Sequence, residues 1–210
     1  MITLFEYQTV KNADSAEITE KKSRFTARVA PVSSERDALA FLNRIRASHR
    51  EASHNVYAYI LRENHIQRYS DDGEPSGTAG LPTLDAIRGA GLTDVCIVTT
   101  RYFGGTLLGA GGLARAYAKA AKLGVDAAGI VRRVLCYEYT VKTDYNLLGR
   151  IRNAAAALSC IAGEIAYTET VCANYFVPYT VLDFTEKITD AASGRVTVTK
   201  KDEGRYIDAD

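Results

Sequence analysis

The sequence predicts an α+β protein of two domains. Segments in which polar and apolar residues alternate, as in half-buried strands, recur with segments of helical spacing along the 210 residues. The rhythm changes near Val131, where a strand–helix–strand–strand–helix–strand series begins. With 47% hydrophobic residues, the chain is long enough for each domain to bury a core. We therefore predict domains at residues 1–132 and 133–210, with the boundary between Gly129 and Val134.

The first domain starts with a strand pattern at residues 21–30, followed by helical spacing over residues 33–50, for which Ser33 or Ser34 is the expected N-cap. Strands are predicted at residues 54–63, 65–70 and 94–103, and helices at residues 81–91 and from Gly111 to a C-terminal stop at Gly124. Helices and strands therefore alternate, which indicates a mixed α/β domain.

The second domain shows a strand at residues 131–141 and a helix that Asp144 is expected to cap. Two strands follow at residues 163–171 and 174–182, then a short helix whose Asp183 and Glu186 resemble a capping box, then a strand at residues 194–200. This β-α-β-β-α-β order is the split arrangement of a ferredoxin-like domain. It predicts a four-stranded antiparallel sheet covered on one face by two helices, with a frayed tail at residues 200–210.

Composition narrows the class of protein. Lys and Arg number 26 against 25 Asp and Glu, so the whole molecule has no bias toward polyanions and a nucleic-acid surface must be a local patch. The four cysteines lie far apart among apolar residues, which indicates structural thiols in a reducing compartment. The N-terminus has no signal-peptide pattern, and no apolar run approaches the ~18 residues of a membrane helix. We expect a soluble cytoplasmic protein with no membrane partner.

A dense glycine loop follows the strand at residues 94–103. Its glycines are Gly104, Gly105, Gly109, Gly111 and Gly112. Glycines at this density indicate positive φ angles or close backbone approach, and the free amides at the next helix's N-terminus could hold an anion beside Arg101 and Arg115. The segment "GAGGLA" matches a dinucleotide fingerprint, but no acidic residue on a second strand follows at the required distance, and the P-loop lysine is missing. We predict no cofactor.

Three cations follow the glycine loop at helical spacing. Arg115, Lys119 and Lys122 share one helix face. With nearby aromatic side chains they could follow the phosphates of RNA, although a solvated helix face explains them equally well. We hypothesise that residues 111–123 bind RNA or a ribosome-associated partner.

An acidic loop, "SDDGEPSGTAG" at residues 70–80, carries the candidate catalytic groups. Asp71, Asp72 and Glu74 could form a weak cation site or supply an acid or base. His54, Asp72 and Ser76 are weak candidates for a nucleophile–base–acid set, because Ser76 has no nucleophile-elbow context. The histidines have no ligand-spaced partners, so we predict no metal centre.

The segments "KKSRF", "SHNVYAY", "SDDGEPSGTAG" and "TRYFGGTLLGAGGLARAY", in this order and spacing, resemble the YigZ/IMPACT family. The resemblance covers about residues 15–125 and, more loosely, the second domain. It implies an N-terminal α/β domain of the ribosomal-protein and translation-factor type and a C-terminal domain like domain V of elongation factor G. It also implies a regulatory role, because eukaryotic relatives modulate a starvation-signalling pathway that acts on translation initiation.

Three function classes follow from these observations. The first is a regulatory binding protein that contacts RNA, the ribosome or a translation factor. The second is an enzyme acting on a phosphorylated small molecule, which requires the glycine and acidic loops to line one cleft. The third is a protein-interaction adaptor, for which an exposed apolar patch on the second domain would be the sign.

Overall fold

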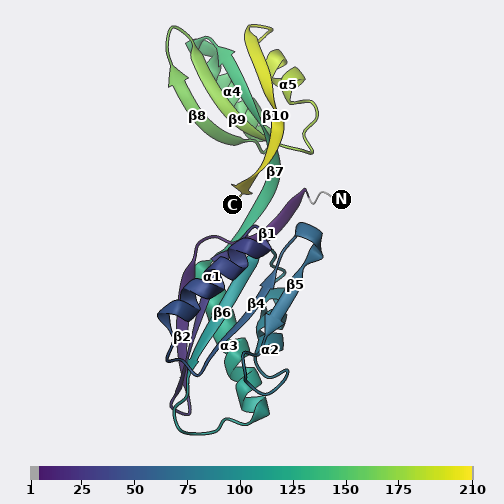
Figure 1. Cartoon of the computed structure of the whole chain (residues 1–210). Coiled ribbons are helices and arrows are strands. Elements are labelled where there is room, and N and C mark those ends of the chain that lie inside the picture. The colour runs from purple at the N-terminus through teal and green to yellow at the C-terminus, as the bar shows by residue number, and fades with distance from the viewer. Residues whose placement is uncertain (1–4, 210) are drawn as a thin grey trace. The chain divides into compact units, whose positions relative to one another are not determined.

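The computed structural model describes residues 5–209, which form two compact units (Figure 1). The N-terminal unit is Gln8–Val131. The C-terminal unit combines residues 132–209 with residues 5–7. The chain passes between the units within two strands, β1 (Glu6–Val10) and β7 (Ile130–Thr143).

The N-terminal unit is built on a five-stranded antiparallel sheet in the order β2-β3-β6-β4-β5. Its strands are β2 (Asp14–Glu20), β3 (Ser23–Pro31), β4 (His54–Ile60), β5 (Gln67–Ser70) and β6 (Val95–Tyr102). Its helices are α1 (Glu35–Ser48), the 3₁₀ turn η1 (Glu63–His65), α2 (Gly80–Gly89) and α3 (Ala110–Ala128). The central strand β6 is buried at seven successive positions, as its continuous apolar and β-branched run predicts.

Helices cover both faces of this sheet (Figure 1). On one face, α1 buries Phe41 and Leu42 against Val98 of β6. On the other, α2 and α3 pack against the side chains that alternate with these, such as Phe25 of β3. Because strand side chains point to opposite faces in turn, polar residues on β3 and β6 are also divided between the two faces.

The C-terminal unit has the predicted β-α-β-β-α-β order. Its elements are β7, the 3₁₀ turn η2 (Tyr145–Leu147), α4 (Leu148–Ala157), β8 (Ile161–Tyr167), β9 (Val171–Pro178), α5 (Phe184–Ala191) and β10 (Val196–Ala209). The sheet order is β1-β7-β9-β8, with β10 also paired to β7. It therefore has five strands, because β1 adds to the predicted four. Ile151 of α4 and Ile188 of α5 are fully buried in one shared core on this sheet.

Several local predictions can be compared with the structure. Ser34 is the N-cap of α1, and its side chain accepts the Asp37 amide at 3.2 Å. The predicted stop at Gly124 is wrong, because α3 continues to Ala128 and ends before Gly129, whose φ is +67°. Gly124 instead allows close packing, since a Cβ there would lie 2.8 Å from Val29 Cγ2.

The ends of the chain also differ from the sequence pattern. Residues 200–209 are not frayed but belong to β10. This strand pairs with β7 along its length, and a bulge between Lys200 and Gly204 shifts the register. Asp144 and Asp183 precede their helices without a side-chain capping bond. Strands β1 and β2 were not predicted. Within residues 5–209, every helix is too short or too polar to cross a membrane.

Candidate functional site

The acidic loop is held in place by its own carboxylates. Both oxygens of Asp71 accept main-chain amides, from Gly77 at 2.9 Å, Ala79 at 3.0 Å and Gly80 at 2.8 Å. These amides lead into α2, so the carboxylate stabilises the N-terminus of that helix by hydrogen bonds and by its charge. Asp71 therefore shapes the loop.

The candidate catalytic residues do not assemble into a triad. His54 Nδ1 donates to the main-chain oxygen of Asp72 at 2.8 Å, not to its carboxylate. That carboxylate accepts the Asn55 amide at 2.7 Å and the Arg46 guanidinium at 2.5 Å. Ser76 is exposed on the loop. The group that would orient a catalytic histidine is thus committed to two other donors.

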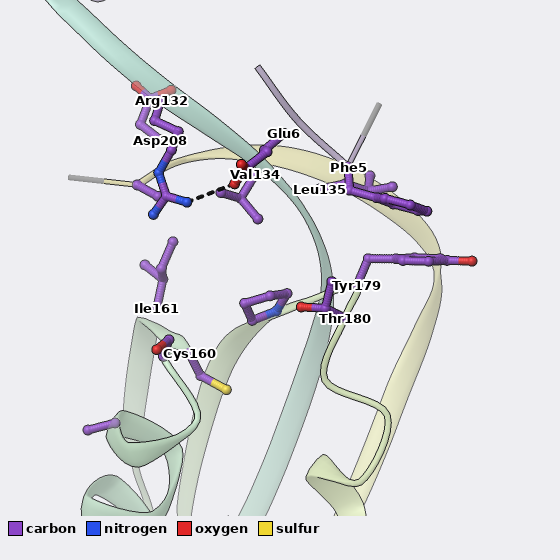
Figure 2. A pocket seen from close by; sticks show the side chains of 14 residues that line it. Phe5, Glu6, Arg132, Val134, Leu135, Cys160, Ile161, Tyr179, Thr180 and Asp208 are labelled. Atoms are coloured by element: carbon purple, nitrogen blue, oxygen red, sulfur yellow. Dashed lines mark hydrogen bonds and ion pairs between the residues drawn. The ribbon is translucent and has the colours of Figure 1, made fainter. Parts of the chain in front are cut away.

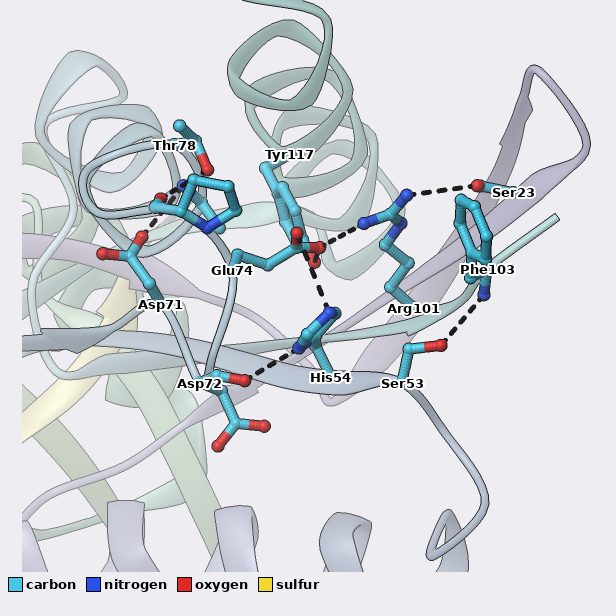
Figure 3. Close-up of polar contacts among 12 residues, drawn as sticks. Ser23, Ser53, His54, Asp71, Asp72, Glu74, Thr78, Arg101, Phe103 and Tyr117 are labelled. Carbon is cyan, nitrogen blue, oxygen red and sulfur yellow. Dashed lines mark hydrogen bonds and ion pairs between the residues drawn. The ribbon is translucent and has the colours of Figure 1, made fainter. Parts of the chain in front are cut away.

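Glu74 of the same loop is the centre of a buried polar network (Figure 3). Its Oε1 accepts from Arg101 Nη1 and from the Tyr117 hydroxyl, each at 2.7 Å, and its Oε2 lies 3.8 Å from His54 Nε2. The side chains of Glu74 and Arg101 are only 3% and 6% exposed. Burial, and then the Glu74 charge, raise the pKa of Tyr117, which keeps its hydroxyl a donor.

This network brings the acidic and glycine loops together through buried contacts, whereas the enzyme hypothesis requires them to line one cleft. Arg101 and Tyr117 flank the glycine loop in the sequence, and Arg101 Nη2 donates to Ser23 Oγ at 3.3 Å. The carboxylate, however, is surrounded by protein groups, and Arg101 stacks against Phe25 and Phe103. Arg101 is therefore an internal cation that a surface anion does not reach. It tethers the loop to β6.

The close backbone approach of the glycine loop is at Gly104. A Cβ there would lie 2.0 Å from the Lys22 carbonyl carbon, and the Gly104 amide donates to Ser23 Oγ at 3.1 Å. Gly105 and Gly109 have positive φ angles of 80° and 72°. Gly111 and Gly112, predicted to be tightly enclosed, are looser, because their added Cβ atoms would have nearest contacts of 3.4 Å and 3.1 Å, both with side-chain atoms.

The three predicted cations of α3 have different surroundings. Lys119 Nζ lies 3.1 Å from Glu20 Oε1 and is neutralised there. Arg115 and Lys122 line a groove between α2 and α3 that also contains Asp85 and Asp126. The row is therefore interrupted by carboxylates, and it borders an apolar surface.

A second group of cations lies on the opposite face of the sheet, which is the face that α1 partly covers. We call it the arginine face and define it as Arg24, Arg28, His49, Thr100 and Tyr102. The arginines alternate with Phe25 and Ala27, which face α2 and α3, so they point to the α1 side. The arginine face and the three cations of α3 therefore lie on opposite sides of the sheet and do not form one surface.

Neutral contacts hold the arginine face together. Arg28 Nη1 donates to Thr100 Oγ1 at 3.0 Å, and that hydroxyl donates to Asn55 Oδ1 at 2.9 Å. The Arg24 guanidinium carbon lies 4.9 Å from the centre of the Tyr102 ring, whose hydroxyl is 2.9 Å from His49 Nδ1. The side chains are thus fixed by β3, β6 and the end of α1.

The charge on this face is only partly compensated. Within residues 5–209 Arg28 forms no ion pair, while Arg24 has one looser contact, 3.7 Å from Glu17. Burial lowers the pKa of His49, and Arg28 and then Arg24 lower it further. Burial also lowers the pKa of Arg28, while Tyr102 and the Glu17 carboxylate act in the opposite direction. Two guanidinium groups close enough to act on one imidazole form a local positive site suited to an anion.

The sequence contains a signal for part of this site. Arg24, Thr26 and Arg28 recur at every second position of a predicted strand, which places all three on one face. His49 and Tyr102, far away in the sequence, join them only through the fold.

The C-terminal unit has a pocket of about 960 Å³ (Figure 2). Phe5 and Tyr179 stack on one side with ring centres 4.6 Å apart, and Arg132 pairs with Glu6 at 2.8 Å on another. Burial raises the pKa of Cys160 in this pocket to about 12, so the thiol stays protonated and unreactive at neutral pH.

Known proteins are similar to this chain over most of its length. The family model described as "Impact N-terminal domain" matches residues 21–125. The "IMPACT family member YvyE" of Bacillus subtilis is 41% identical over 207 residues, covering 98% of this chain and 95% of that protein. The "IMPACT family member YigZ" of Escherichia coli is 34% identical over 181 residues, covering 83% and 87%.

More distant similarities extend this picture. The "Protein IMPACT homolog" of Dictyostelium discoideum is 42% identical over 97 residues, which cover 44% of this chain and 28% of that protein. A solved structure titled "Crystal structure of an hypothetical protein" is similar with a TM-score of 0.62 and 28% identity, covering 93% of this chain and 97% of that chain.

Proposed function

The chain belongs to the IMPACT family, and we propose that it is a translation-linked regulatory protein that contacts the phosphates of RNA through the arginine face. The link to translation rests on the family relationship. The proposal includes a cytoplasmic location, a first domain of the ribosomal-protein and translation-factor type, and a second like domain V of elongation factor G.

One observation carries the assignment of the surface. Arg28 is partly buried, and within the described residues it has a neutral hydroxyl and no carboxylate as its hydrogen-bond partner. A buried charge is normally paired, because its desolvation is otherwise uncompensated. An incoming phosphate would supply the direct ion pair that Arg28 does not form with Glu17, and Arg24 on the same strand would contribute a second contact.

The spacing of the two arginines favours a polyanion. Four strand residues separate their Cα atoms by about 13 Å, so the pair extends along the sheet. An aromatic ring, Tyr102, lies between them and the end of α1, where His49 adds a titratable group. Cations with aromatic groups on an open sheet surface are a common arrangement for single-stranded nucleic acid.

The enzyme alternative has weaker support. Asp71, Asp72 and Glu74 all have fixed partners within the protein, so the acidic loop has no uncommitted carboxylate to act as a base. A phosphorylated small molecule is therefore an outcome to test and not a second proposal.

The test compares RNA affinity in variants of the two cation groups. Arg24→Gln with Arg28→Gln should weaken the binding of a fluorescent single-stranded oligoribonucleotide and reduce its salt dependence. Two phosphate contacts contribute a slope of about −1.4, so between about 50 and 200 mM salt their loss removes roughly a sevenfold change in affinity. Arg44→Gln, the same substitution at an exposed residue of α1, is the matched control.

The α3 row supplies the competing arm. If Arg115, Lys119 and Lys122 changed together to Glu abolish RNA binding while the arginine-face double variant retains it, the interface lies on α3 and our assignment is wrong. Unchanged binding in every variant would remove RNA contact by either surface. Turnover of a phosphate ester that is lost on Asp72→Asn would instead support the enzyme.

A further inference from the structure

We propose that the groove between α2 and α3 docks an acidic amphipathic helix of a protein partner. The groove encloses about 700 Å³ and lies entirely within the N-terminal unit. It is separate from the arginine face, which occupies the other side of the sheet. The inference does not depend on RNA binding and goes beyond the proposed function.

Small apolar residues form the floor of this groove. They are Ala86, Gly89, Ala90, Ala114 and Ala118. The four alanines are half-buried, and Ile130 at the groove is 49% exposed. Short side chains on two neighbouring helices let the backbone of a third helix approach closely, so larger apolar residues of that helix would fill the space. RNA would desolvate this floor without gaining hydrogen bonds.

The charge of the side chains along the α3 wall determines which charge a partner must carry. Arg115 and Lys122 line the groove, and within residues 5–209 neither forms an ion pair. Of the two carboxylates at the groove, Asp85 is neutralised by Arg88 at 3.0 Å, which leaves Asp126. The uncompensated charge is therefore positive, and carboxylates on a partner would complement it.

The spacing of the two cations fits a helical partner. Seven residues separate them, which is about 10.5 Å along α3. A helix lying beside α3 presents carboxylates at the same interval when they are placed seven residues apart, and its intervening apolar residues then face the alanines. The groove is thus suited to a helix that carries an apolar face bordered by acidic side chains at helical spacing.

The test uses two synthetic probes. One is a three-heptad amphipathic peptide with leucines on one face and glutamates at seven-residue spacing, and the other replaces each glutamate by lysine. The acidic peptide should bind about threefold to tenfold more tightly than the lysine peptide, because two exposed ion pairs add only a modest amount of binding free energy. Binding is followed by fluorescence anisotropy with the full chain.

Variants of the groove complete the design. Arg115→Glu with Lys122→Glu should reverse the preference, and Ala118→Glu should block both peptides. Lys119→Glu, a charge reversal on the same helix outside the groove, should change neither affinity. Circular dichroism establishes whether each variant folds. If Ala118→Glu does not fold, the double variant Arg115→Glu with Lys122→Glu, which changes exposed residues only, still decides the test.

Three results would overturn the proposal. They are equal affinity for the two peptides, absence of binding by both, and binding that survives the double charge reversal with its preference intact. Self-association that sedimentation detects in the parent chain and that Ala118→Glu removes would show that a second copy of the chain occupies the groove. None of these outcomes bears on the arginine-face variants, so the two proposals fail independently.

Discussion

Replacing Glu74 by Met should strongly destabilise the N-terminal unit. The substitution removes a carboxylate that is 3% exposed and leaves Arg101, 6% exposed, as a buried cation without its partner. Breaking a buried ion pair by removing one member costs about 3–5 kcal/mol of unfolding free energy. The hydroxyl of Tyr117 also loses its acceptor, so the upper part of that range is expected.

A second substitution tests the cause. When Arg101→Met is added to Glu74→Met, the uncompensated charge disappears and similar volume is kept, so the double variant should be more stable than Glu74→Met alone. Glu20→Ala is the control, because its pair with Lys119 is on the surface and its loss should cost at most about 1 kcal/mol.

The assay must report on the N-terminal unit alone, because one unfolding curve for a chain of two compact units averages both. Native-state amide hydrogen exchange of β6 and α3 provides that local free energy. A loss of less than about 1 kcal/mol for Glu74→Met would refute the reasoning. So would a double variant less stable than the single one, since it would show that the two side chains contribute separately.

Two further predictions concern the glycine loop and the arginine face. Gly104→Ala should cost about 1–3 kcal/mol in the same hydrogen-exchange measurement, because its Cβ would lie 2.0 Å from the Lys22 backbone. Gly111→Ala, whose nearest contact would be a side-chain tip, should be neutral or gain up to about 1 kcal/mol. Equal effects would contradict the observed packing. Arg28→Gln should raise the pKa of His49 in an NMR titration, because Arg28 is the largest Coulombic cause of its depression after burial. The depressed pKa means that His49 contributes stability above its unfolded-state pKa and that this contribution is lost as the pH falls through the folded value, so the variant should lose less stability on acidification. An unchanged pKa would show that the arginine is too distant to act on the imidazole.

Local pattern was enough to predict most of the secondary structure. The helical stripe of α1, its Ser34 cap and the apolar run of β6 are properties of neighbouring residues, and each is present in the structure. The order of elements in the second domain followed from the same periodicities, and the motifs within about residues 15–125 indicated the family, whose model matches residues 21–125. These features need no contact between distant residues.

Contacts between segments far apart in the sequence determine the strands and the helix end that local pattern did not predict. Strand β1 and the end of β10 are strands because β7 supplies hydrogen-bond partners for them, which no property of their own residues determines. Gly124 was predicted to end a helix, but it lies inside α3 because β3 packs against it. Glycine is compatible with both positions, so only the neighbour distinguishes them.

The candidate site depends most on tertiary structure. The sequence placed Arg101 beside the glycine loop as an anion ligand, whereas Glu74, which is 27 residues away, holds it inside the protein. Arg28 became the stronger candidate because the fold gives it a hydroxyl as its hydrogen-bond partner and no carboxylate within ion-pair distance among the described residues. Residue type sets which interactions are possible. Burial and the partners within reach decide whether a charge is paired inside the fold or exposed at its surface.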